Sequence, residues 1–360
     1  MKEVNKELST LFKLSNPNIN QADWTQICID IEATFDWVYF LEKAISSNLA
    51  GYLLPYPEIA EAYYPTLVIN KIKAYQHKIQ IHSVQLLDLV LLLHANLEKL
   101  ELKHAFLKGC DTLIRGNEKL KQRQVSDIDI LINESDINAF IQVLEQLGCN
   151  VWTSVQKSDW HEKNHIQHAP VQATLGNLKI DVHFHLFNST TSYQISTAAL
   201  LNEVEKHSFQ GQQLPLLPWK AAQLFCVLHV YKHLYYGSMF KVAAINDLYR
   251  IDFEALQELA LIWNARKAFI EMDAFWKTWL SKKYEHTFLG RTVLWFMTGR
   301  RRTLQEKFIF TGRRLPAHQK EFWNIQHLYK TIFPDHAYLN QHFGGGPYLK
   351  SWFRRFKKLF

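Results

Sequence analysis

The chain has 360 residues, of which 48% are hydrophobic and 21% are charged, and its formal net charge at pH 7 is +7. This composition excludes a wholly disordered protein, and the length allows about two folding units with buried cores. The four cysteines, Cys28, Cys110, Cys149 and Cys226, form no closely spaced pair, which argues against a zinc site or a disulfide framework and favours a reducing compartment.

Neither the N-terminus nor the most apolar segment indicates export or membrane insertion. The first ten residues, MKEVNKELST, carry both charge signs and lack the apolar core of a signal peptide. The most apolar run, 86–97, contains Asp88, His94 and Asn96 and is shorter than the roughly 20 residues that span a bilayer. We therefore expect a cytoplasmic protein.

Residues 1–83 are predicted to form an N-terminal helical part, because apolar residues recur there at intervals of three and four positions. Pro55, Pro57 and Pro65 place at least one loop in this part, since proline cannot continue a helix interior. Residues 83–103 are then expected to form one long helix.

Residues 84–190 are predicted to form a small mixed α/β unit that follows the start of this helix. Its first strand is the short apolar stretch 104–107, which ends in a turn at Lys108 and Gly109. After a polar, basic stretch, the β-branched segment 125–132 predicts a buried strand.

A helix is expected next, beginning at Glu134 or Ser135 and stopped by Gly148, and a further strand should follow it. Residues 168–174 and 178–187 then alternate in polarity on either side of a Gly-Asn pair, which is typical of a β-hairpin.

From Trp219 onward the pattern is helical again, and residues 191–343 are predicted to form a C-terminal helical part. In the tail 344–360, bulky apolar residues at helical spacing alternate with lysine and arginine, which predicts a basic amphipathic helix over 349–360. This helix would either dock on the protein's own core or contact a membrane surface. The expected fold class is α+β, a small mixed-sheet core flanked by N- and C-terminal helical parts.

Acidic residues on two predicted strands carry the candidate chemistry. Side chains at positions i and i+2 of a strand share one face, so Asp127 and Asp129 point to the same side. Such neighbouring carboxylates repel each other unless a cation neutralises them or one is protonated. Asp181 lies on the second strand of the hairpin, which can return beside them. Three carboxylates predict magnesium sites, since two ions can clamp the attacking and leaving oxygens at a phosphorus atom.

Lys108 and Gly109 complete the predicted site. A glycine lets the backbone approach a triphosphate closely, and a neighbouring lysine offsets the phosphate charge. Together these residues resemble the nucleotidyltransferase superfamily, and more closely its uncharacterised branch often encoded in bacterial polysaccharide and peptide natural-product gene clusters. The likeness extends roughly from residue 37 to 248 and rests on Lys108-Gly109, Arg123, Ser126-Asp127-Ile128-Asp129 and Asp181-Val182-His183.

The resemblance implies the superfamily's αβ fold, a bound nucleoside triphosphate, and two magnesium or manganese ions at Asp127 and Asp129. Asp181 would be the acceptor-activating base or a ligand of the second metal ion. The nucleotide-binding residues would be Lys108, Gly109, Ser126 and Arg123, the last as a phosphate or structural contact. His183 and Asp247 are candidate acceptor-site residues, and each also has a purely structural interpretation.

The predicted function is metal-dependent transfer of a nucleotidyl group to a hydroxyl or phosphate acceptor, such as a sugar, a sugar phosphate or a small peptide product. Two alternatives remain open. One is a non-catalytic or toxin–antitoxin-type nucleotide-binding protein, for which the modest basic charge leaves transfer RNA as a partner. The other is a membrane-surface scaffold that acts through residues 349–360.

Overall fold

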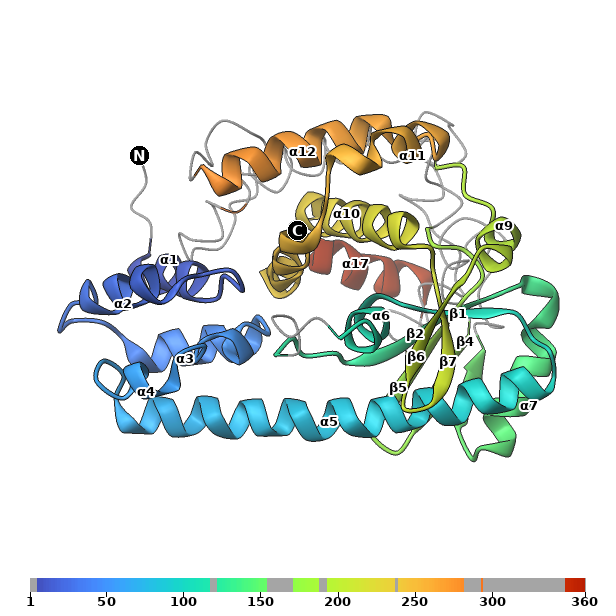
Figure 1. The fold of residues 1–360 in the computed structure, drawn as a ribbon, viewed down its shortest axis with the longest axis horizontal. Helices are drawn as coiled ribbons and strands as arrows, with labels where there is room; N and C mark the ends of the chain where they lie inside the picture. Colours follow the sequence, from blue (N-terminus) through green and yellow to red (C-terminus); the bar gives the residue numbers. More distant parts are fainter. Residues whose placement is uncertain are drawn as a thin grey trace.

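The computed structural model describes residues 5–116, 122–153, 171–187, 193–236, 239–281, 293 and 347–359, and among these the side chains of 235–244 and 355–359 are not described. Positions 168–170 of the predicted hairpin lie outside these ranges. The described residues combine helices with one mixed sheet of seven strands, which confirms the predicted α+β class. Figure 1 shows the sheet gathered at one end of the molecule and the N-terminal helices at the other.

A series of helices precedes the sheet, as predicted: α1 (Lys6–Leu14), α2 (Gln21–Ile29), α3 (Trp37–Ser46), the 3₁₀ turn η1 (Ala50–Tyr52), α4 (Pro57–Ala60) and α5 (Thr66–Lys99). Asn5, Asn20 and Asp36 cap the first three, because each side chain accepts a hydrogen bond from a backbone N–H of the first turn. Helix α4 begins at Pro57, where the missing N–H would have had no partner within the helix.

Helix α5 begins earlier than predicted. It has 34 residues and starts at Thr66, directly after Pro65, whereas the sequence predicted a helix over 83–103. At 1.5 Å per residue it is about 50 Å long, and in Figure 1 it runs along the lower edge of the molecule from the N-terminal helices to the sheet. The predicted boundary between residues 83 and 84 therefore falls inside one continuous helix.

The strands are β1 (His104–Leu107), β2 (Asp127–Ile132), β3 (Asn150–Thr153), β4 (Val171–Leu175), β5 (Leu178–His183), β6 (Glu205–Phe209) and β7 (Gln212–Leu216). Their order in the sheet is β3-β4-β5-β2-β1-β7-β6. Strand β2 lies at the centre, antiparallel to β1 and parallel to β5. Helix α6 (Lys108–Ile114) follows β1, and the turn η3 (Glu134–Asp136) and helix α7 (Ile137–Gln146) follow β2. The predicted strands, helix and hairpin are confirmed, except that β5 ends at His183 and not at the predicted residue 187.

The alternation of side chains along β2 separates two hydrophobic cores. Ile128, Ile130 and Ile132 belong to the core that includes α7 and the second half of α5. Leu131 belongs to the other core, which includes the N-terminal helices and the C-terminal helices. Asp127 shares the face of Leu131, as Asp129 does, so both acids point to the side of the sheet that the C-terminal helices cover.

The sheet extends beyond the range predicted for it. Strands β6 and β7 form an antiparallel pair between residues 205 and 216, where the sequence predicted helix, and β7 adds to β1 as a parallel neighbour. Helical structure resumes with α10 at Trp219, as predicted.

In the described part of the C-terminal region, the helices are α9 (Thr197–Asn202), α10 (Trp219–Tyr236), the 3₁₀ segments η5 (Met239–Arg250) and η6 (Glu254–Leu256), α11 (Gln257–Ile262), α12 (Arg266–Leu280) and α17 (Tyr348–Leu359). In Figure 1, α10 lies between α12 and the sheet, and the two helices share one hydrophobic core. None of the helices in the described ranges combines the length and apolar character that crossing a membrane requires.

Candidate active site

Three carboxylates converge where β2 begins. Strands β2 and β5 run in parallel with Asp129 directly opposite Asp181 in the register. Asp127 lies two positions before Asp129, on the same face of β2. One oxygen atom from each of the three carboxylates lies within 4.8 Å of the others. The structure therefore brings together all three acids that the sequence singled out.

Asp129 is the most enclosed of the three, with 2% of its surface exposed. Its Oδ1 atom accepts hydrogen bonds from Lys108 Nζ at 2.5 Å and from His183 Nε2 at 2.7 Å. Burial alone would raise the pKa of Asp129, but the charge of Lys108 and the hydrogen bond from His183 outweigh it and hold the pKa well below its usual range. Burial, and next the charge of Lys108, lowers the pKa of His183, so the ring is neutral and donates from Nε2.

Asp127 and Asp181 have different surroundings. The Ser126 hydroxyl donates to Asp127 Oδ1 at 2.9 Å, yet burial and then the negative charge of Asp129 raise the pKa of Asp127. The Asp181 carboxylate accepts a hydrogen bond from Gln172 at 3.0 Å and pairs with the Lys179 ammonium at 2.9 Å. Asp127 is therefore the acid of the three whose negative charge is least compensated by protein groups.

Lys108 adopts an unusual backbone conformation. Its φ angle is 51°, in the left-handed region, which costs a residue with a Cβ atom about 1 to 2 kcal/mol. Helix α6 begins at this residue immediately after β1, so the turn predicted at Lys108 and Gly109 is wrong. The strained residue places its ammonium on Asp129, across the junction between the strand and the helix.

Gly109 packs closely against the segment that leads into β2. A Cβ atom at this position would lie 2.5 Å from a methyl carbon of Val125 and 3.1 Å from Nη1 of Arg123. The structure thus gives a packing reason for glycine here, whereas the sequence argument had invoked close approach to a phosphate.

A cleft with a cavity volume of about 330 Å³ contains this constellation. The acids, Lys108, Gly109, Arg123 and Ser126 line one side, and α10 contributes three polar residues to the wall, namely His229, Lys232 and His233. The Nε2 atoms of His229 and His233 are 2.9 Å apart, so one ring donates to the other. Sequence reasoning missed Lys232 and Asn48, which also lines the cleft; the spacing of four residues between the histidines is the one signal for this wall.

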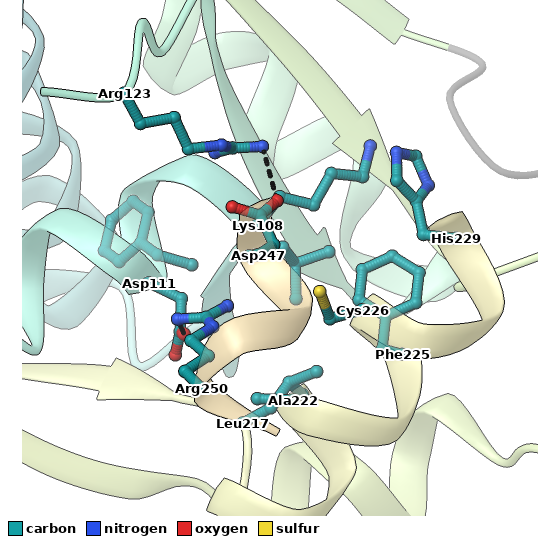
Figure 2. A pocket seen from close by; sticks show the side chains of 12 residues that line it. Lys108, Asp111, Arg123, Leu217, Ala222, Phe225, Cys226, His229, Asp247 and Arg250 are labelled. Carbon is teal, nitrogen blue, oxygen red and sulfur yellow. Dashed lines mark ion pairs between the residues drawn. The ribbon is translucent and has the colours of Figure 1, made fainter. Parts of the chain in front are cut away.

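A smaller inner pocket, with a cavity volume of about 20 Å³, adjoins the cleft and shares Lys108, Arg123 and His229 with it. Figure 2 shows this inner pocket between α10 and the chain around Asp247, with Lys108 extended toward His229. Arg123 Nη2 pairs with Asp247 Oδ2 at 3.0 Å, as the dashed line marks. The other carboxylate oxygen, Asp247 Oδ1, is buried and has no hydrogen-bond partner among the described residues.

A second acid lines the inner pocket from α6. Asp111 Oδ1 accepts a hydrogen bond from Arg115 Nε at 2.7 Å, and Asp111 Oδ2 lies 3.7 Å from Arg250 Nη1. Like Asp247 Oδ1, Asp111 Oδ2 is buried and has no hydrogen-bond partner among the described residues. The pocket therefore offers two hydrogen-bond acceptors, surrounded by the apolar side chains Phe106, Leu107, Leu217, Ala222 and Phe225.

The structure places the candidate residues at different depths. Ser126 and Gly109 line the cleft, and Arg123 lines both spaces while it is ion-paired. Asp247 lines the inner pocket. His183, in contrast, is 2% exposed, lines neither space and contacts Asp129 instead.

Comparisons with known proteins show the family of the chain. The model of a family described as uncharacterised nucleotidyltransferases matches residues 33–281. Among curated proteins there is no match. A crystal structure of ANT(2'')-Ia in complex with adenylyl-2''-tobramycin is 13% identical with a TM-score of 0.33, and the alignment covers 51% of this chain and 95% of that chain. A solution structure of ANT(2'')-Ia, titled an antibiotic-resistance factor, has the same identity and TM-score and coverages of 57% and 97%.

Proposed function

The chain belongs to the uncharacterised nucleotidyltransferase family, a class of enzymes, and we propose that it transfers a nucleotidyl group from a nucleoside triphosphate to a hydroxyl or phosphate acceptor. The observation that carries this proposal is the convergence of Asp127, Asp129 and Asp181 in a cleft that also holds Lys108. An acceptor oxygen would bond to the α-phosphorus while the bond to the oxygen bridging the β-phosphorus breaks. Pyrophosphate then leaves.

The three carboxylates suit a divalent metal ion. Their oxygens lie within 4.8 Å of one another, and an all-oxygen ligand set favours magnesium or manganese over softer metals. The raised pKa of Asp127 supports this assignment, because the protein's own groups leave its negative charge incompletely balanced. Magnesium or manganese bound here would offset the negative charge of the phosphates and of the attacking oxygen.

The surrounding residues would divide the work of binding and positioning. Lys108 and Ser126, with the backbone at Gly109, face the cleft where a triphosphate would lie. Asp181 would accept the acceptor's proton or hold a second metal ion. The hydrogen bond from His183 to Asp129 supports a positioning role for this histidine and not direct contact with an acceptor.

The inner pocket is a candidate site for one small polar group of the acceptor, beside the larger cleft. Asp247 Oδ1 and Asp111 Oδ2 are buried acceptors without a partner among the described residues, so they would bind hydroxyl or amino groups. The cavity volume of about 20 Å³ limits such a group to roughly the size of a water molecule. The ion pair with Asp247 also supports a structural role for Arg123 more than a direct phosphate contact.

Pyrophosphate release tests this proposal. The full chain is incubated with magnesium, each of the four ribonucleoside triphosphates and a panel of sugars, sugar phosphates and peptides, beside Asp127→Asn as the matched inactive control. We expect acceptor-dependent release by the unaltered chain only. Nucleotide binding without release under any combination would favour the non-catalytic, nucleotide-binding alternative.

A contact with an anionic membrane surface is a second candidate property, supported by α17. Leu349 and Phe353 lie four positions apart and are 67% and 57% exposed, whereas Ser351 is fully buried. The helix thus exposes two of its large apolar side chains, and a basic residue follows each of them in the sequence. An acceptor attached to a lipid would be brought to the cleft by such a contact.

A further inference from the structure

The candidate metal site already contains positive charge of its own. Lys108 Nζ lies 2.5 Å from Asp129 Oδ1, and Lys179 Nζ lies 2.9 Å from the Asp181 carboxylate. Two ammonium groups therefore neutralise two of the three acids, and Asp127 has a hydroxyl as its partner. A divalent cation that enters this site meets the ammonium of Lys108 on the most buried of its ligands.

We propose that Lys108 is a displaceable counter-ion, which holds Asp129 while the site lacks a metal ion and moves to the triphosphate when metal ion and nucleotide bind. This inference rests on the proposed function. It makes Lys108 a positioning residue for two ligands in succession, beyond the fixed phosphate contact that the sequence suggested.

The hydrogen bonds on Asp129 show why the lysine has to move. Oδ1 accepts from both Lys108 and His183, which occupies both lone pairs of that oxygen. A cation that binds through Oδ1 must displace one of these donors, and a cation that binds through Oδ2 would be repelled by the ammonium nearby. His183 is held inside the sheet, with 3% of its side chain exposed, whereas 22% of the Lys108 side chain is exposed. Lys108 is therefore the donor that can leave.

The surroundings of Lys108 allow this movement. The residue lines both the cleft and the inner pocket. Figure 2 shows its side chain extended toward His229, which also lines both. The backbone of Lys108 is itself strained, because its φ of 51° lies in the left-handed region, which an ordinary helical lysine does not adopt. Phosphate oxygens in the cleft would offer the ammonium new partners of the same charge as Asp129.

The consequence is that one side chain opposes metal binding and favours triphosphate binding. Removing its charge should therefore change the two affinities in opposite directions. A lysine that served only as a phosphate contact would affect the triphosphate alone, and one that served only the fold would affect both through stability. The opposite signs distinguish the proposed role from these two.

The test measures the two ligands separately on the full-length chain. Manganese binding is followed by electron paramagnetic resonance without nucleotide, and inorganic tripolyphosphate binding by calorimetry in metal-free buffer, which avoids any assumption about the base. We expect Lys108→Met to bind manganese several-fold more tightly and tripolyphosphate several-fold more weakly than the unaltered chain. Lys108→Arg should retain weak manganese binding, since it keeps the positive charge.

Two further variants separate Lys108 from its neighbours. Lys103→Met removes an exposed lysine that hydrogen-bonds to Asn202 and should change neither affinity. Lys179→Met removes the ammonium group that pairs with Asp181. Because the Lys179 side chain is 42% exposed, this change should tighten manganese binding less than Lys108→Met does.

A measurement on the unaltered side chain covers the case in which Lys108→Met does not fold. Lysines are labelled by reductive ¹³C-methylation, and the Lys108 resonance is identified by its absence from Lys108→Arg. It should shift when magnesium and tripolyphosphate are added together.

The outcomes separate this inference from the proposed function. If manganese binds with equal affinity to the unaltered chain and to Lys108→Met, or if the methyl resonance does not shift, Lys108 is not a displaceable counter-ion while the nucleotidyl-transfer proposal stands. If neither the unaltered chain nor any variant binds manganese, both proposals fail.

Discussion

The guanidinium of Arg123 lies 3.0 Å from the carboxylate of Asp247, and this ion pair connects the segment that leads into β2 with the 3₁₀ segment η5. The two residues are 124 positions apart in the sequence. Arg123 also packs under Gly109, so the pair positions strand β2 relative to the C-terminal helices.

Breaking this ion pair should destabilise the protein strongly. Asp247→Ala would leave Arg123 partly buried without its carboxylate, and we expect a loss of about 3 kcal/mol in the free energy of unfolding. Urea denaturation gives that number. Asp273→Ala is the control, because its pair with Lys277 is at the surface and should contribute at most about 1 kcal/mol. Similar losses in both variants would show that the Arg123–Asp247 pair has no special structural weight.

Asp127 and Asp129 should differ in their effect on stability, although we expect both to be needed for transfer. Asp127→Asn should abolish pyrophosphate release and leave the fold as stable or slightly more so, because it removes a carboxylate whose ionisation is disfavoured. Asp129→Asn should abolish release and cost about 2 kcal/mol, because it weakens two charge-assisted hydrogen bonds. Transfer at the normal rate by Asp127→Asn, or in the presence of a chelator, would contradict the mechanism.

Stability should fall in mild acid because of His104. This residue is 5% exposed, and its Nε2 lies 3.1 Å from Nδ1 of His94. Burial lowers the pKa of His104 to about 4, below the value of about 6.5 for an unfolded chain. The unfolded state therefore binds the proton first, so stability is complete above pH 6.5 and falls by roughly 3 kcal/mol as the pH decreases to 4.

Urea midpoints measured at about pH 7.5, 5.5 and 4.5 would check this expectation, because these values extend from above the onset of the stability loss to near its lower end. His104→Gln should flatten the dependence, and His77→Gln, which replaces an exposed histidine, should not. An unchanged slope in His104→Gln would assign the acid sensitivity to other groups.

Local patterns made the centre of the fold predictable. The β-branched run of β2, the helix α7 and the turn of the β4–β5 hairpin each have a signal within about ten residues, and the period of two along β2 predicted the pair Asp127 and Asp129. The contacts of Lys108 with Asp129 and of His183 with Asp129 depend on strand register, which no local pattern contains.

Other elements could not be predicted for physical reasons. Strand β6 is at the edge of the sheet, has no large apolar residue before Phe209 and is only partly buried, so it lacks the alternation of a half-buried strand. The first half of α5 falls in the predicted N-terminal helical part, but no local pattern shows that it continues into the second half without a break. Residues Lys232 and Asn48 reach the cleft only because distant helices pack together, and their own neighbours in the sequence give no sign of it.

Gly109 should tolerate no side chain unless Val125 becomes smaller. The added methyl of Gly109→Ala would lie 2.5 Å from Val125 Cγ1, and such overpacking costs about 1 to 3 kcal/mol. In a Val125→Ala background the same substitution should cost clearly less, because the opposing methyl groups are gone. A double-mutant cycle by urea denaturation measures this coupling. Strictly additive effects would show that the glycine serves another purpose, such as approach to a phosphate.

The C-terminal helix α17 should bring the protein to anionic membranes. Leu349 and Phe353 are exposed, and five basic residues adjoin them, namely Lys350, Arg354, Arg355, Lys357 and Lys358. Each positive charge near an anionic surface contributes about 1 kcal/mol, and burying a large apolar side chain contributes about 1.5 to 3 kcal/mol. The gain should exceed the loss from ordering the helix at the interface.

Sedimentation with phosphatidylserine vesicles tests this prediction on the full chain, with phosphatidylcholine vesicles as the uncharged comparison. The unaltered chain should sediment with the anionic vesicles at low salt and be released at high salt, because salt screens the charges. The double variant Leu349→Ser, Phe353→Ser should stay in the supernatant. Leu67→Ser, Val84→Ser is the matched control, because both residues are exposed apolar side chains on α5 and lack the basic helix. Equal sedimentation of the two double variants would locate the lipid contact elsewhere. If none of the chains sediments with the vesicles, α17 is a surface helix that does not bind lipid.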